Sequence, residues 1–88
     1  MGAEYHVYVL RNPKGRYYVG LSEDPRRRLQ EHNAGLSQWT KGHRPWEIVW
    51  QNGPLPLGEA RKLENKLKRQ GRGHGFYSIT GLPKSEGS

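Results

Sequence analysis

The sequence contains no cysteine, and this absence excludes several classes of protein. Without a thiol the chain can form neither a disulfide scaffold nor a thiolate zinc site, and it cannot use a cysteine nucleophile. Long apolar runs are also missing, since no stretch approaches the roughly 20 residues that a membrane helix needs, and the N-terminus lacks the apolar core of a signal peptide. We therefore expect stability from packing alone, no membrane partner and a cytoplasmic location.

Acidic residues are scarce relative to basic ones. The 88 residues include 15 Lys and Arg but only 8 Asp and Glu, which gives a formal net charge of +7. Such a surplus favours a polyanionic partner, nucleic acid first, although a basic protein that is merely soluble would show the same charge. The length supports one domain, expected over residues 1–82, with a disordered polar tail over residues 83–88.

Two segments rich in β-branched and aromatic residues, 5–10 and 16–21, predict a pair of strands. The Asn-Pro-Lys-Gly segment at 12–15 joins them and suits a type I turn followed by a bulged glycine. The two strands are therefore predicted to form a hairpin.

The type of turn decides where two tyrosines point. In the bulged turn Asn12 pairs with Arg16, so Tyr8 faces Gly20 and lies on the same face of the sheet as Tyr18. A plain two-residue turn would send the two tyrosines to opposite faces. The sequence favours the bulged form, and with it a shared face.

Helix signals follow the hairpin. Asp24 can cap free amides and Pro25 suits the first helical position, so a helix is predicted over residues 25–34, with Gly35 as its stop. Residues 36–45 show little periodicity and predict a loop.

The second half of the chain predicts one more strand and one more helix. Residues 46–50 predict a third strand, which the Asn-Gly-Pro cluster at 52–54 should end. Helical apolar spacing predicts a helix over residues 57–70, stopped by Gly71, and residues 76–79 suggest a short edge segment.

Two residues of the first predicted helix could bind a ligand or take part in catalysis. Arg28 and His32 are four residues apart and project from one face, where a cation and a titratable imidazole could meet one ligand. Because Arg26 and Arg27 make this helix basic all round, a solvated face explains the pair equally simply.

Glu64 lies on or beside the apolar stripe of the second helix. A carboxylate on the side meant for the core needs a partner, and a salt bridge to Arg61 or Lys68 is the simpler interpretation. The functional interpretation is a ligand for a hard cation such as Mg²⁺, which takes one or two carboxylates together with waters and substrate phosphates.

The ordered set of these residues resembles the GIY-YIG nuclease family, in particular its small single-domain bacterial branch. His6-Val7-Tyr8 and Tyr18-Val19-Gly20 stand where the two triplets belong, the segment 27–33 resembles the helix with the catalytic arginine, and the segment 41–45 resembles part of the bacterial branch. The likeness covers most of residues 5–70. His6 replaces the usual glycine, and a C-terminal asparagine found in many members is missing, with Ser78 in the comparable stretch.

The resemblance implies a fold, an activity and a site. The fold is α/β, with a small, mostly antiparallel three-stranded sheet flanked by helices in the order β-β-α-β-α. The activity is metal-dependent endonucleolytic hydrolysis of DNA phosphodiester bonds, with one Mg²⁺ or Mn²⁺ ion and a tyrosine-activated water. A non-catalytic nucleic-acid-binding module is the alternative, and a small structural component of a ribonucleoprotein a weaker one.

Specific residues carry these expectations. The expected catalytic residues are Tyr8, Tyr18, Arg28, His32 and Glu64, with Glu64 also the metal ligand. The expected nucleic-acid-binding residues are Arg27, Trp39, Lys41, His43 and Arg44. The substrate is expected to be single-stranded, duplex or branched DNA, with a protein partner as one source of specificity.

Overall fold

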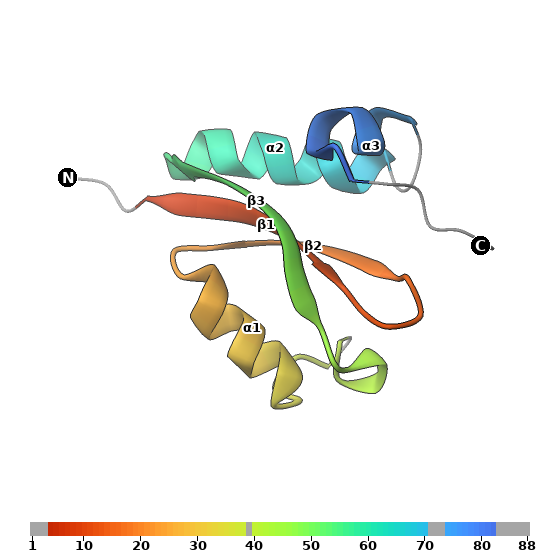
Figure 1. The fold of residues 1–88 in the computed structure, drawn as a ribbon. Helices are drawn as coiled ribbons and strands as arrows, with labels where there is room; N and C mark the ends of the chain where they lie inside the picture. The colour runs from red at the N-terminus through yellow and green to blue at the C-terminus, as the bar shows by residue number, and fades with distance from the viewer. Residues whose placement is uncertain (1–3, 39, 71–73, 83–88) are drawn as a thin grey trace.

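The computed structural model describes residues 4–38, 40–70 and 74–82. Three strands, β1 (Tyr5–Arg11), β2 (Tyr17–Ser22) and β3 (Glu47–Leu55), form one antiparallel sheet in the order β2-β1-β3 (Figure 1). The predicted α/β class and three-stranded sheet are confirmed, with one helix more than expected. The predicted tail at 83–88 and the Gly71 stop lie outside the described residues.

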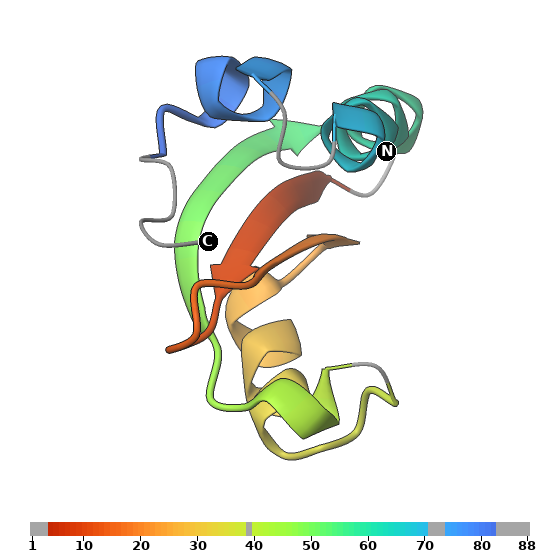
Figure 2. The same cartoon turned by 90° about the vertical axis from the view of Figure 1, so that its right-hand side faces the viewer.

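Helices cover both faces of the sheet. The helix α1 (Pro25–Asn33) lies on one face, whereas α2 (Leu57–Gln70) and α3 (His74–Thr80) lie on the other (Figures 1 and 2). Each face has its own apolar core, because successive strand residues point to opposite sides. The core on the α2 face contains Val7, Val9, Tyr17, Val19, Ala60, Leu67 and Phe76. The core on the α1 face contains Tyr8, Leu10 and Trp46.

The hairpin between β1 and β2 has the predicted bulged turn. Gly15 has a φ of 83°, a conformation that glycine adopts without steric cost, and the Asn12 amide donates to the Arg16 carbonyl at 3.1 Å. In the resulting register Tyr8 pairs with Gly20 and Leu10 with Tyr18. The prediction that the two tyrosines share one face is therefore confirmed.

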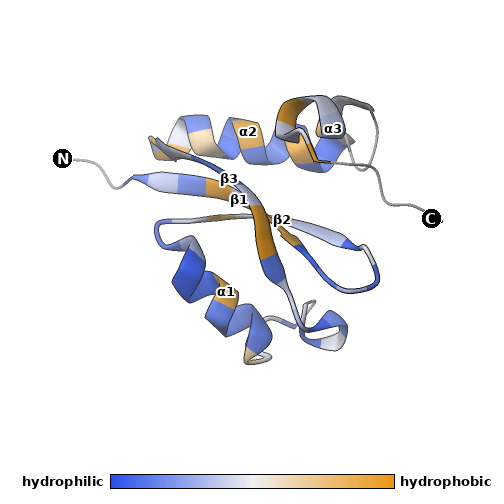
Figure 3. Cartoon of the chain, viewed as in Figure 1, coloured by the Kyte–Doolittle hydropathy of each residue, from blue (hydrophilic) through white to orange (hydrophobic). Residues whose placement is uncertain are grey.

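The first helix begins where its capping signal predicts. The Asp24 side chain accepts a hydrogen bond from the Arg27 amide, and Pro25 occupies the first turn. This helix is hydrophilic along most of its length (Figure 3). In the part of the chain that the structure describes, no helix is both long and apolar enough to cross a membrane.

The predicted end of the third strand is wrong, because β3 continues through residues 52–54 to Leu55. The pairing with β1 shifts between Tyr5 and Val7, which gives β3 one extra residue, and Gly53 absorbs it with a φ of 136°. Pro54 lacks an amide donor but lies on an edge strand, where no further neighbour requires one. A bulge thus continues the strand where turn residues suggested a stop.

The predicted edge segment at 76–79 is also wrong, because these residues belong to α3. Phe76 is buried, and the centroid of its ring lies 5.4 Å from the ring centroid of Tyr17. Thr80 is buried four residues later, and its hydroxyl donates to the Phe76 carbonyl at 3.0 Å. This helical spacing of buried residues outweighs the β-propensity of the individual side chains.

Candidate active site

The side chain of Tyr8 crosses the neighbouring strand above a glycine. It is almost fully buried, and a Cβ atom built on Gly20 would lie 2.4 Å from both the Cζ and Oη atoms of Tyr8. Only a residue without a side chain leaves room for the phenol at this place. Because β2 is an edge strand, the Tyr8 hydroxyl is brought to the edge of the sheet, where residues of α1 approach it.

His32 of α1 meets the Tyr8 hydroxyl inside the protein. The Nε2 atom of His32 lies 3.1 Å from the Tyr8 Oη atom, and the Nδ1 atom lies 2.7 Å from the Oγ1 atom of Thr40. Thr40 is itself buried, and its carbonyl accepts a hydrogen bond from the Trp46 indole at 2.9 Å. Both nitrogens of the imidazole thus have partners, and the ring has a defined orientation.

Tyr18 lies beside the same imidazole. Its ring centroid is 5.0 Å from that of His32 in an edge-on arrangement and 6.3 Å from that of Trp46. Tyr18 is only half-buried, in contrast to Tyr8. The two tyrosines therefore present one hydroxyl deep in the site and one ring nearer to solvent.

Arg28 lies one helical turn before His32. One of its terminal nitrogens donates to the Oε1 atom of Glu31 at 2.8 Å. Its guanidinium also interacts electrostatically with the Tyr8 hydroxyl. Because the guanidinium has five donors in a planar fork, these two partners leave donors for a further anion.

Glu64 reaches the site from α2, on the other side of the sheet. The residue is 9 % exposed, and its carboxylate interacts electrostatically with Tyr8. It also forms an ion pair with Lys68, with Nζ and Oε2 atoms 3.2 Å apart. The salt bridge expected from the simpler interpretation is therefore present, to Lys68, and it coexists with the electrostatic interaction with Tyr8.

The surroundings shift the pKa values of two of these groups, Tyr8 and His32. Burial and the nearby Tyr18 raise the pKa of Tyr8 well above its ordinary value, although Arg28 opposes the change. Burial and the charge of Arg28 lower the pKa of His32. At neutral pH the site therefore holds a protonated phenol next to a neutral imidazole.

The residues predicted to bind nucleic acid have more varied surroundings. Arg27 is exposed on α1, whereas Lys41 and His43 form a 3₁₀ turn within the predicted loop. The Arg44 side chain donates to the Lys41 carbonyl at 2.8 Å and to the Asn33 carbonyl at 3.3 Å, so it braces the loop against α1. Trp39 lies outside the described residues.

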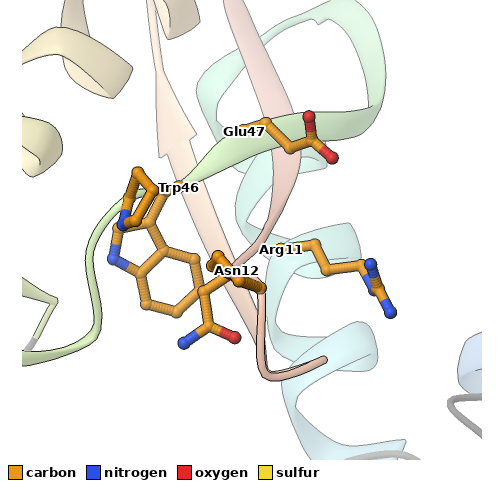
Figure 4. Close-up of a pocket in the computed structure, with 6 residues that line it drawn as sticks. Arg11, Asn12, Trp46 and Glu47 are labelled. Atoms are coloured by element: carbon orange, nitrogen blue, oxygen red, sulfur yellow. The ribbon is translucent and has the colours of Figure 1, made fainter.

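A hollow of about 240 Å³ lies between the hairpin turn and the start of β3 (Figure 4). The labelled side chains of Arg11 and Glu47 extend away from the Trp46 ring. The side-chain nitrogen of Asn12, in the wall of the hollow, donates to the His43 carbonyl at 3.1 Å, and its side-chain oxygen accepts from the Arg16 backbone amide at 2.8 Å. Asn12 therefore joins the hairpin turn to the loop at 41–45, and none of Tyr8, Tyr18, Arg28, His32 and Glu64 lines this hollow.

Two residues of the site were not predicted from the sequence. Thr40 holds His32, yet it lies in a loop without periodicity, so no local pattern identifies it. Gly20 gives room to Tyr8, and a glycine inside a predicted strand is a signal of such a close approach.

The two departures from the family pattern have visible consequences. His6 is accommodated within β1, but its Nδ1 atom is buried and finds no hydrogen-bond partner among the described residues. Ser78 is exposed on α3, a helix that lies on the opposite face of the sheet from α1.

Comparison with known proteins agrees with this geometry. Residues 4–77 match the GIY-YIG catalytic domain. A UPF0213 protein of Aeromonas hydrophila is 35% identical over 71 residues, which cover 80% of this chain and 52% of that protein. A UPF0213 protein of Streptococcus pneumoniae is 36% identical over 73 residues, which cover 82% of this chain and 74% of that protein. The chain thus spans about half the length of the Aeromonas relative.

A eukaryotic nuclease subunit is also similar. The structure-specific endonuclease subunit slx1 of Xenopus laevis is 45% identical over 53 residues, which cover 51% of this chain and 19% of that protein. The match to the catalytic domain extends from Glu4, just before β1, to Tyr77 in α3, and it includes every residue of the candidate site. This chain therefore belongs to the GIY-YIG family.

Proposed function

We propose that this chain is an endonuclease that hydrolyses DNA phosphodiester bonds with one divalent metal ion and a water activated by Tyr8. The observation that carries the proposal is the contact of 3.1 Å between the Tyr8 hydroxyl and His32 Nε2. A protonated phenol can act as a base only after its own proton has left, and at this distance His32 can take that proton.

His32 is the proposed acceptor of the Tyr8 proton. Its lowered pKa keeps the imidazole neutral, so that one ring nitrogen has a free lone pair. We assign the ring proton to Nδ1, which then donates to Thr40 Oγ1, and this leaves Nε2 to accept from Tyr8. As the phenol gives its proton to Nε2, its oxygen becomes able to take a proton from water. Because burial raises the pKa of Tyr8 and lowers that of His32, this transfer requires the positive charges of Arg28 and of the proposed metal ion to stabilise the phenolate.

Arg28 and Tyr18 are proposed to bind the phosphate. The guanidinium is already oriented by Glu31, and its remaining donors can bond to two oxygens on which negative charge develops. Tyr18 is half-buried beside His32, so its hydroxyl can hold a phosphate oxygen nearer to solvent.

Glu64 is the proposed ligand of one Mg²⁺ or Mn²⁺ ion. The described residues contain no group of three or more histidine and acidic side chains that could form a closed cage. A single, mostly buried carboxylate still fits Mg²⁺, which keeps several waters and takes its other ligands from substrate phosphates. Such an ion would supply positive charge to the scissile phosphate and its departing oxygen.

Specificity is proposed to come from outside this domain or from the shape of the substrate. The slx1 relative is named as a subunit, and the region it shares with this chain is 19% of its length. A protein partner of this chain is therefore one proposed source of specificity, and a single-stranded, duplex or branched structure of the DNA is another.

The first expected result is metal-dependent cleavage. Purified protein should cut at least one of labelled single-stranded, duplex and flap DNA with Mg²⁺ or Mn²⁺, and excess EDTA should abolish cutting. Matched RNA substrates test the assignment to DNA, and Tyr8→Phe controls for contaminating nucleases. Cleavage that persists in EDTA would remove the metal from the proposal. Binding without cleavage of any substrate would favour the nucleic-acid-binding module instead.

A second expected result concerns stability at acidic pH. His32 has a lowered pKa in the folded protein, so below about pH 6.5 the unfolded chain takes up a proton that the folded chain does not. The free energy of unfolding should therefore fall as the pH decreases from about 6.5 towards the folded pKa.

Urea unfolding of the wild type and of His32→Gln at several pH values isolates this contribution. The difference in stability between the two proteins should shrink towards acidic pH, because glutamine does not titrate. An equal difference at pH 7.5 and pH 5 would show that burial does not keep His32 neutral.

A further inference from the structure

The outer face of α2 is unusually rich in positive charge. The exposed basic residues of this helix are Arg61, Lys62, Lys66, Lys68 and Arg69. The helix has only two acidic residues, and each already pairs with a lysine, Glu59 with Lys62 at 3.5 Å and Glu64 with Lys68 at 3.2 Å. A positive surplus therefore remains on this face after the internal ion pairs are counted.

This face is also hollowed. An open depression of about 740 Å³ is lined by Lys62, Asn65, Lys66, Lys68 and Arg69. The helix α2, which carries it, lies on the opposite side of the sheet from α1 and the loop at 41–45, where nucleic-acid binding was predicted from the sequence (Figures 1 and 2). The depression is therefore a second basic surface, separate from the predicted one.

We propose that the outer face of α2 binds the phosphate backbone of a duplex segment of the DNA substrate. Lys62, Lys66 and Arg69 follow one stripe of the helix and span roughly 10 Å along its axis. One strand of duplex DNA carries a phosphate about every 3.4 Å of axis, and consecutive phosphates lie farther apart in space because the strand winds around that axis, so this stripe can reach about two consecutive phosphates. Spacing and sign of charge both fit a nucleic-acid backbone.

The lining residues favour duplex over single-stranded DNA. Among the described residues that line the depression none is aromatic, so the surface offers cations and one amide but no platform for unstacked bases. A duplex presents its phosphates outward and keeps its bases stacked. The surface should therefore bind the backbone of a duplex without reading its sequence.

Lys68 connects this surface to the candidate active site. It lines the depression and pairs with Glu64, whose carboxylate interacts with Tyr8. DNA bound on α2 would therefore continue towards the edge of the sheet where Tyr8 and Arg28 lie. The inference rests on the proposed function for its substrate, but the binding that it describes can be measured without cleavage.

The test removes two basic residues that form none of the ion pairs of α2 described above. Lys66→Gln/Arg69→Gln takes two charges from the stripe and spares Lys68, which pairs with the proposed metal ligand. Lys14→Gln/Arg16→Gln removes the same charge from exposed residues of the hairpin turn and serves as the matched control. Lys66→Arg/Arg69→Lys retains the charge, and circular dichroism checks the fold of each variant.

Binding of labelled duplex DNA is measured in EDTA over a series of salt concentrations. The α2 double variant should bind about tenfold more weakly and reduce the salt slope by about 2, whereas the control and the charge-retaining variant stay within about twofold of the wild type. An equal loss in the α2 and control variants would overturn the proposal, because only net charge would then matter. An unchanged affinity of the α2 variant would overturn it as well, and would direct attention to an acidic protein partner.

The substrate preference gives a further check. Single-stranded DNA of equal length should lose clearly less affinity than the duplex in the α2 double variant. An equal or larger loss on the single strand would contradict the assignment to duplex. A failure of cleavage in the earlier assay would leave this binding result intact, so the two proposals can fail separately.

Discussion

Glu64→Ala should reduce the rate of DNA cleavage by about a thousandfold or more while DNA affinity in the absence of metal holds or rises. The carboxylate is the proposed metal ligand, and it is mostly buried beside Tyr8. When no metal is present it repels the phosphate, so its removal should not weaken binding. Turnover at saturating DNA and affinity in EDTA are the two measurements.

Lys68→Gln is the matched control for this variant. It breaks the ion pair of 3.2 Å but leaves the carboxylate in place, so turnover at saturating DNA should stay within several-fold of the wild type. If Glu64 served only as a partner of Lys68, both variants would behave alike. A folded Glu64→Ala protein, checked by circular dichroism, that still cuts at the wild-type rate would refute the metal-ligand proposal.

Arg28→Lys should lower turnover by about a hundredfold or more with little change in affinity. Lysine keeps the positive charge but lacks the planar fork that can bond to Glu31 and to two phosphate oxygens together. Arg28→Ala should be at least as impaired, yet it removes only one of 15 basic side chains and should still bind DNA. Geometry and charge are thereby tested separately.

Arg26→Ala provides the comparison on the same helix. Arg26 is exposed and two residues away, so its loss changes the charge of α1 without changing the site. Its turnover should resemble that of the wild type. If Arg28→Lys were to retain full turnover, Arg28 would be a simple phosphate-binding charge and the proposed stabilisation of the transition state would be wrong.

The parts of the fold that local sequence determines could be predicted. The Asn-Pro-Lys-Gly turn sets the pairing of the hairpin, and the register in turn places Tyr8 and Tyr18 on one face. The hydrogen bond from the Arg27 amide to the Asp24 side chain likewise sets the first residue of α1. Both are decided within a few residues of the chain, where turn and capping chemistry act directly.

The parts of the fold that depend on tertiary contacts could not be predicted from the sequence. The length of β3 depends on a bulge at Gly53 opposite the start of β1, and α3 depends on the burial of Phe76 against Tyr17. In the site, three of the five expected catalytic residues, Tyr8, Tyr18 and His32, are linked by close contacts between β1, β2 and α1, and Arg28 and Glu64 are linked to Tyr8 by their charges. Thr40 completes the site through a contact between a loop and a helix, which no local pattern reveals.

The crossing of Tyr8 over Gly20 makes the site sensitive to the alignment of the two strands. A slip of one residue would set Tyr8 opposite Val19 or Leu21, whose side chains would also exchange faces of the sheet. The phenol would then lose its path to the sheet edge and its contact with His32. A misaligned hairpin could therefore be compact and still lack the proposed site, so the turn at Gly15, which holds the alignment, determines from a distance along the strand whether Tyr8 and His32 meet.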